Sequence, residues 1–197
     1  STALPLYTML NDQYLIGRVL GQGGFGITYK ALDTLDNKIV AVKEYMPSEY
    51  SERVGKNVSP LKDDAKAMRV FEHGKSSYID EIRTLHQFKN LDGIVKIYTH
   101  FQENNTAYLV MEYLDGRNLK SFVKNKGGSI SSKLAGRIII KAAAALEKVH
   151  SANVLHRDIS PENIFIMRND VDVKLIDFGA ARRNVEDSNQ EKSVLLK

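Results

Sequence analysis

The feature that most limits what this chain can fold into is the segment 156–163 (HRDISPEN), together with the later segment 177–179 (DFG). Asp158 and Asn163 lie between two short apolar stretches, which predict a pair of strands that holds them in a loop. Asp177 follows the end of another predicted strand. An Asp, an Asn and a second Asp in this order suit a magnesium-dependent phosphoryl-transfer site. One carboxylate would orient the attacking hydroxyl, while the amide oxygen and the other carboxylate hold the metal.

The composition is that of an ordinary globular domain, with 43% hydrophobic and 26% charged residues. Cysteine is absent, which excludes disulfides and thiolate metal sites and fits a reducing compartment. The 28 basic and 24 acidic residues are interspersed, so we expect no nucleic-acid partner despite the net charge of +4. No stretch has the length of a membrane span and the start lacks a signal-peptide pattern. A cytoplasmic location is therefore expected.

The first third of the chain has the pattern of β-strands. Segments 14–20, 25–31 and 38–43 are short, rich in β-branched and aromatic residues, and bounded by Gly, Asp or Asn turns. Segment 45–62 is polar and contains two prolines, which predicts an irregular insertion.

Helices and strands then alternate towards the second half. Asp63 and Asp64 are placed to open a helix that Gly74 is expected to break, and a second helix follows it. Strands are predicted around 94–101 and 107–113. Beyond them Ser131 and Ser132 can cap a helix that runs to about residue 150, with apolar residues at every fourth position: Leu134, Ile138, Ala142 and Leu146. A boundary between two lobes is expected near residues 112–116.

The glycine-rich segment 21–26 (GQGGFG) fits the pattern G-x-G-x-x-G, which alone is a weak signal. A dinucleotide-binding fold requires a helix straight after the last glycine, but a strand pattern follows here, and no Gly-Lys-Ser/Thr of a P-loop is present. Two interpretations stay open. The segment is either a hairpin whose backbone amides lie over phosphates or a plain hairpin turn.

Lys43 ends the third predicted strand and Glu81 lies on a downstream helix. A lysine at the end of an apolar strand is usually a surface residue, and a single helix acid is usually solvated. Taken together with the later Asp and Asn residues, they favour a pair in which Lys43 touches nucleotide phosphates and Glu81 holds it.

With these motifs in order, the chain resembles the eukaryotic-like (Hanks-type) Ser/Thr protein kinases, and bacterial members most, over about residues 14–197. The resemblance implies an α+β, protein-kinase-like fold. A five-stranded antiparallel sheet with one principal helix would form an N-lobe with its hinge over residues 1–114. Residues 115–197 would form an incomplete, mainly helical C-lobe. ATP would bind in the cleft between the lobes.

The resemblance also implies roles for individual residues, with ATP and Mg²⁺ as cofactors. Asp158 would be the catalytic base, Lys43 and Glu81 the phosphate-binding pair, and Asn163 and Asp177 the metal ligands. The glycines Gly21, Gly23 and Gly26 would cover the phosphates. The adenine site would comprise Thr28, Ala41, Met111 as gatekeeper, the hinge from Glu112 to Leu114, and Phe165. A spine of Leu85, Ile97, His156 and Phe178 would link the lobes.

The chain departs from the family's pattern in three places. Thr28 stands where the glycine loop usually has Val. Ser160 replaces the usual Lys, which removes a point charge from the transferring phosphate. The activation segment should continue past Lys197, so we expect this chain to be an inactive fragment whose exposed C-lobe core favours self-association. Arg157 could pair a phosphate on that segment, with Ser188 and Ser193 as candidate acceptors.

Three functions are weighed. The first is a kinase that transfers the γ-phosphate of ATP to Ser or Thr of proteins. The second is a non-catalytic nucleotide-binding module, a pseudokinase or regulatory unit, which the change at Ser160 favours. The third is a small-molecule kinase of the antibiotic-phosphotransferase type. Members of that type have His-Gly-Asp where this chain has His156-Arg157-Asp158, which argues against it.

Overall fold

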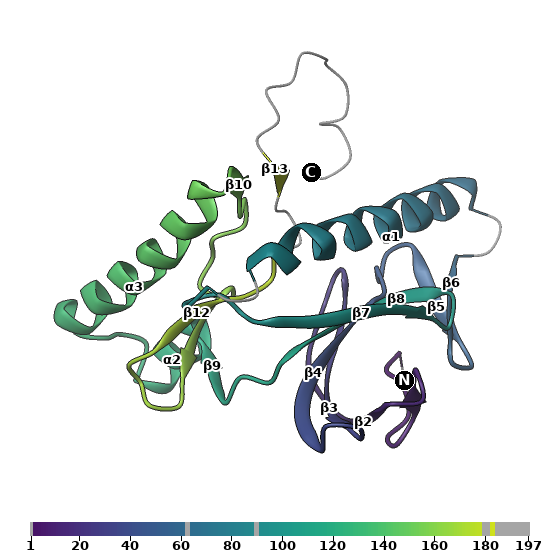
Figure 1. The fold of residues 1–197 in the computed structure, drawn as a ribbon, viewed down its shortest axis with the longest axis horizontal. Coiled ribbons are helices and arrows are strands. Elements are labelled where there is room, and N and C mark those ends of the chain that lie inside the picture. The colour runs from purple at the N-terminus through teal and green to yellow at the C-terminus, as the bar shows by residue number, and fades with distance from the viewer. Residues whose placement is uncertain (1, 62–63, 89–90, 179–181, 184–197) are drawn as a thin grey trace, which may run out of the picture.

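The computed structural model describes residues 2–61, 64–88, 91–178 and 182–183. Its main feature is an antiparallel sheet with the strand order β1-β2-β3-β4-β8-β7 (Figure 1). The strands are β1 (Met9–Leu10), β2 (Tyr14–Gly23), β3 (Gly26–Asp33), β4 (Lys38–Tyr45), β7 (Ile97–Glu103) and β8 (Thr106–Glu112). An antiparallel sheet was expected, but the described sheet has six strands instead of five because the two-residue β1 pairs with the start of β2.

A single long helix, α1 (Ala65–Leu85), lies across this sheet and packs against β7 and β8 (Figure 1). Asp64 caps it, since its carboxylate accepts from the N–H groups of Lys66 and Ala67. The predicted break at Gly74 is wrong. Gly74 lies where the helix meets Tyr45, and an added Cβ would come 2.1 Å from the tyrosine oxygen, so the glycine permits close packing. The short 3-10 helix η1 (His86–Phe88) follows directly.

Segment 45–62 is not irregular, as the polar composition predicted, because it contains a two-stranded hairpin. Strands β5 (Ser51–Val54) and β6 (Asn57–Pro60) pair around Gly55, whose φ of +63° suits a tight turn. Arg53 of this hairpin reaches back to pair with Glu44 of β4. A buried charge thus anchors the hairpin to the main sheet, and this partner is not visible in a local sequence pattern.

The later elements form a second, smaller group. Strands β9 (Gly116–Asn118), β11 (Ile164–Met167) and β12 (Val173–Leu175) make a three-stranded sheet, beside α2 (Leu119–Asn125) and α3 (Ser132–Ser151). Strand β10 (Val154–Leu155) pairs with β13 (Arg182–Arg183). The predicted pairing of 154–155 with 164–166 is therefore wrong, since each stretch finds its partner elsewhere.

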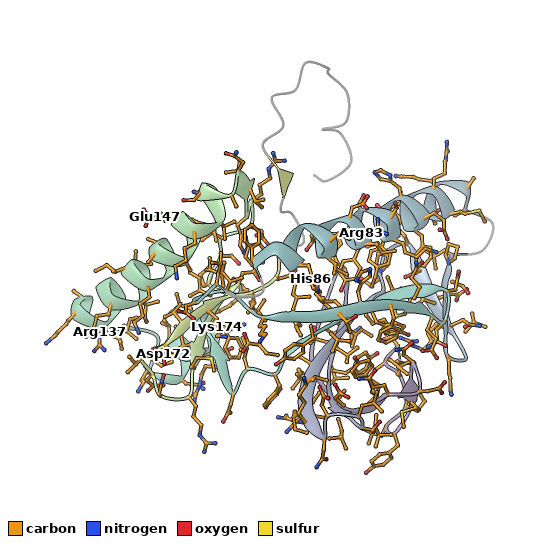
Figure 2. All side chains as sticks on the ribbon, viewed as in Figure 1. Arg83, His86, Arg137, Glu147, Asp172 and Lys174 are labelled. Atoms are coloured by element: carbon orange, nitrogen blue, oxygen red, sulfur yellow. The ribbon has the colours of Figure 1, made fainter. Side chains whose placement is uncertain are left out.

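Helix α3 matches its sequence pattern, with Ser131 as the cap and with Ile138 and Ala142 buried. Its outer face is turned away from the other elements, as the labelled Arg137 and Glu147 show in Figure 2. Ile139 and Ile140 on this helix are 57% and 70% exposed. None of the helices in the described ranges is long and apolar enough to cross a membrane.

Segment 93–95 joins the two groups of elements. Ile94 forms a parallel bridge with Leu175, and hydrogen bonds run from Val95 N to Leu175 O (3.0 Å) and from Leu175 N to Gly93 O (2.8 Å). The end of β12, and with it Asp177, is thus held at a fixed place beside the chain that leads into the main sheet.

Candidate functional site

The glycine-rich segment forms the hairpin between β2 and β3, in which Gly23 faces Gly26 and the turn consists of Gly24 and Phe25. Gly26 is required by packing, since an added Cβ would lie 2.1 Å from the carbonyl oxygen of Glu44. At Gly21 and Gly23 an added Cβ would meet no protein atom within 4 Å. Packing therefore explains only the last of the three predicted glycines.

The tip of this hairpin is attached to the chain that follows β4. The N–H of Met46 donates to the carbonyl of Phe25 (3.1 Å), and the N–H of Ser48 donates to that of Gly24 (3.0 Å). These bonds continue the β3–β4 ladder past the turn. The turn of the glycine-rich hairpin is therefore fixed by backbone hydrogen bonds to the residues that follow β4.

Lys43 lies in β4, between Thr28 of β3 and Leu109 of β8. Its ammonium group pairs with Asp177 at 2.6 Å, and its side chain is 16% exposed. Within the described part of the chain no ion pair joins Lys43 to Glu81, so the predicted pair is not formed in this structure. The ion pair of Lys43 with Asp177 instead connects β4 to the segment that follows β12.

The electrostatics of Glu81 follow from its place near Lys43 and Asp177. Glu81 lies half-buried on α1, and burial raises the pKa of its carboxyl to about 8. The positive charge of Lys43 lowers this pKa and the carboxylate of Asp177 raises it. Desolvation and a neighbouring acid both favour the protonated form of a carboxyl. The ammonium of Lys43 is bound to Asp177, whose side chain is 41% exposed.

Asp158 and Asn163 are joined directly. The Nδ2 amide of Asn163 donates to the backbone carbonyl of Asp158 (3.0 Å) and to its carboxylate Oδ2 (2.8 Å). Asn163 is buried, whereas Asp158 is exposed. These two bonds thus join an exposed acid to a buried amide five residues further along the chain.

The buried side chain of His156 binds the backbone of this loop. The N–H of Asp158 donates to Nδ1 of His156 (3.3 Å), which assigns the ring proton to Nε2, the atom 3.2 Å from the carbonyl oxygen of Ile176. Burial lowers the pKa of the His156 imidazole, so the neutral ring is favoured. The ring also packs on Phe178 at a centroid distance of 4.3 Å. His156 therefore connects the Asp158 loop to the strand that leads to Asp177.

Among the non-glycine residues with the left-handed backbone conformation, two lie at or next to the predicted site residues Asp158 and Asp177. Arg157 has a φ of +61° and Asp177 a φ of +54°. Such strain is concentrated at functional sites, where the surrounding structure fixes it. Asp158 and Asp177 each lie at or next to one of these positions.

The predicted adenine-site residues lie in or beside strands β3, β4, β8 and β11. In the ladder of β4 with β8, Ala41 faces Met111. Phe165 lies in β11, and Leu114 follows β8.

The spine residues Leu85, Ile97, His156 and Phe178 are all buried, and the last two are in ring contact. The predicted acceptors Ser188 and Ser193 lie outside the described residues.

Sequence reasoning missed the polar partners that hold these elements. The carboxylate of Glu112 accepts from the N–H of Lys96 (2.7 Å) and from the ammonium of Lys174 on β12; Lys174 is labelled in Figure 2. Glu44, next to Lys43, is fully buried and binds Tyr29, Tyr108 and Arg53. The only available sequence signal was a charged residue at an inward position of an apolar strand.

Comparisons with known proteins show which family this chain is similar to. The family model described as "Protein kinase domain" matches residues 14–195. The chain is 36% identical to a cyclin-dependent kinase-like protein of Caenorhabditis elegans, over 87% of this chain and 42% of that protein. It is 31% identical to Serine/threonine-protein kinase B of Synechocystis, over 90% of this chain and 28% of that protein. The solved structure "PpkA-294 apo form" superposes with a TM-score of 0.83 at 30% identity, covering 91% of this chain and 62% of that one. The chain thus spans less than half the length of these curated relatives.

Proposed function

This chain belongs to the protein kinase family, and on that premise we propose that the protein that carries it transfers the γ-phosphate of ATP to Ser or Thr hydroxyls of protein substrates. The relatives named as serine/threonine-protein kinases support this substrate class. The observation that carries the proposal is the joined pair of Asp158 and Asn163.

Asp158 is proposed as the catalytic base. Asp158 is an exposed residue, and its orientation is fixed by the amide of Asn163, 2.8 Å from its carboxylate, and by the bond from its own N–H to His156. An oriented carboxylate can accept the proton of a substrate hydroxyl as that oxygen attacks phosphorus. Lys43 is proposed to bind the nucleotide phosphates, with Glu81 as its partner during that step. Gly21, Gly23 and Gly26 are proposed to cover the phosphates.

The residues present fit Mg²⁺. The Nδ2 group of Asn163 is occupied by its two bonds to Asp158, which leaves its amide oxygen as the group suited to a cation. Asp177 adds a carboxylate, and oxygen ligands of these two kinds are those that Mg²⁺ prefers. Asn163 and Asp177 would hold the ion, which when bound supplies positive charge to the phosphates.

The nucleotide base is proposed to lie at the join of the two element groups. Thr28, Ala41, Met111, Glu112, Leu114 and Phe165 are the residues proposed to surround adenine. In this proposal residues 1–114 act as the N-lobe with its hinge and residues 115–197 as part of the C-lobe. The need for ATP and the absence of cysteine from the sequence support the proposal that the domain works in the cytoplasm.

The test is Asp158→Asn in the full-length protein. Because only the base is removed, the rate of phosphate transfer is expected to fall at least about a hundredfold. Binding of a fluorescent ATP analogue should change less than about twofold, since the base serves transfer and not nucleotide binding. Asp170→Asn is the matched control, because Asp170 is a partly exposed acid of the same region that pairs with Lys126. Undiminished transfer by the Asp158 variant would exclude the assignment.

A second candidate function is nucleotide binding without transfer. It is favoured by the pairing of Lys43 with Asp177 in place of Glu81, and by Ser160 where the family usually has Lys. Transfer of radiolabelled phosphate from ATP to a generic protein substrate separates the two functions. Nucleotide binding with no labelled product would support the second one.

A further inference from the structure

Two tyrosines connect strand β4 and helix α1 in opposite directions. Tyr45 of β4 donates its hydroxyl to the backbone carbonyl of Phe71 in α1 (3.3 Å). Tyr78 of α1 donates its hydroxyl to the backbone carbonyl of Lys43 in β4 (3.2 Å). The two rings stack on each other at a centroid distance of 5.6 Å and an interplanar angle of 28°. Strand and helix are therefore linked twice within a few residues of Lys43.

Gly74 makes this close approach possible. An added Cβ at Gly74 would lie 2.1 Å from the Tyr45 hydroxyl oxygen and 3.1 Å from the ring carbon that bears it. Tyr45 is only 6% exposed, so its ring has little room to move away. A glycine inside a helix is unfavourable compared with alanine, and its presence here has a packing reason.

Both hydroxyls act as donors under ordinary conditions. Burial raises the pKa of Tyr45 to about 12, with a further contribution from Glu72. Burial likewise raises the pKa of Tyr78 well above its ordinary value, and the charge of Glu81 raises it further. The phenols therefore stay protonated, as a hydrogen bond to a carbonyl requires.

Tyr78 and Glu81 lie three residues apart on α1, so they share one face of the helix. The hydroxyl of Tyr78 is bound to the main-chain carbonyl of Lys43. The positive charge of the Lys43 ammonium lowers the pKa of the Glu81 carboxyl. The main chain of Lys43 is thus attached to the same turn of helix that carries Glu81. The ammonium group, however, is bound to Asp177.

We infer that Tyr78 is a positioning residue that holds the main chain of Lys43 at a fixed place relative to Glu81. Its hydrogen bond is the lock between α1 and β4 at Lys43, while Tyr45 and Gly74 contribute close packing of the two elements. Exchange of the Lys43 ammonium between Asp177 and Glu81 is then a movement of side chains and does not require the helix to swing away. The catalytic part of this inference rests on the proposed function.

The test compares Tyr78→Phe with Tyr45→Phe in the full-length protein. Each variant removes one buried hydroxyl from the same stacked pair, but only Tyr78 is bound to Lys43. Both variants should lower the midpoint of thermal unfolding by similar amounts, since each loses one hydrogen bond. Tyr78→Phe should lower kcat about tenfold, with KM for ATP changed less than about threefold. Tyr45→Phe should leave kcat within about twofold.

A positioning role and a merely structural role give different results. Equal losses of kcat in the two variants, or no loss in Tyr78→Phe, would overturn the inference. If the wild-type protein transfers no phosphate, the proposed function fails and hydrogen exchange of the α1 amides decides the inference instead. Faster exchange in the Tyr78 variant confined to residues 76–85 supports the lock at Lys43. The same exchange pattern in both variants contradicts it.

Discussion

The two sides of the candidate site are built in different ways. On the sheet side, Gly26, Lys43 and Glu81 lie on long regular elements, namely two eight-residue strands and a 21-residue helix. On the loop side, Asp158, Asn163 and Asp177 lie in or beside strands of two to four residues. Left-handed backbone at Arg157 and Asp177 sets the direction of the chain there.

The difference shows how each side keeps its shape. The sheet side relies on buried side chains, above all Glu44, which accepts from Tyr29 (2.9 Å), Tyr108 (2.8 Å) and Arg53. The loop side relies on side-chain bonds to backbone, such as those of Asn163 and His156. Substitution of a partner of the buried Glu44 should therefore strongly lower the stability of the sheet side. The shape of the loop side depends more on its backbone conformation.

The largest effect is expected for Arg53→Met on the sheet side. The change leaves the Glu44 carboxylate buried without its cation, which costs about 3–5 kcal/mol of unfolding free energy when one partner of a buried pair is removed. Lys38→Met is the control, because its pair with Asp36 is exposed and contributes about 0–1 kcal/mol. Denaturant unfolding of both variants checks this. Similar small losses would mean that the tyrosine hydroxyls alone satisfy Glu44.

The places of the motif residues in the fold could be predicted from the sequence, whereas their roles stay predictions. Asp158, Asn163 and Lys43 are each adjacent to or within short apolar segments, and these segments do form strands. The main sheet was also predictable, since its strands alternate or run apolar between turn residues. The strand that was not predicted, β1, has only two residues and is too short to give a sequence pattern.

What the sequence did not predict depends on contacts between distant residues. Gly74 looks like a helix break until Tyr45 is placed beside it. The hairpin 51–60 looks irregular because its anchor, the Arg53–Glu44 pair, joins two separate strands. The partner of Lys43 is likewise a distant residue, since Lys43 and Asp177 are 134 positions apart in the sequence.

The next effect concerns pH and the same sheet side. Burial raises the pKa of Glu81 to about 8, above its ordinary value, so the folded state binds more protons than the unfolded state between these values. Stability from this group is complete below the unfolded pKa and is lost as pH rises towards 8. We expect the unfolding free energy to fall by about 2 kcal/mol between roughly pH 6 and pH 7.5, since one group contributes at most about 1.4 kcal/mol per pH unit.

Glu81→Gln should remove this slope, while Asp80→Asn, an exposed acid on the same helix, should retain it. Denaturant unfolding of the wild type and both variants across this pH range is the measurement. A slope that survives in the Glu81 variant would assign the pH dependence to another group.

The smallest effect is expected on the loop side, at Arg157. Its φ of +61° is unfavourable for any residue with a Cβ, and glycine alone adopts it without strain. Arg157→Gly should therefore be more stable than Arg157→Ala by about 1 kcal/mol. At Arg137, an exposed position inside α3 (Figure 2), the order should reverse, with alanine better than glycine by about 1 kcal/mol. Thermal unfolding of the four variants gives both differences. Alanine proving the more stable choice at both positions would show that the loop side is not held by backbone strain at Arg157.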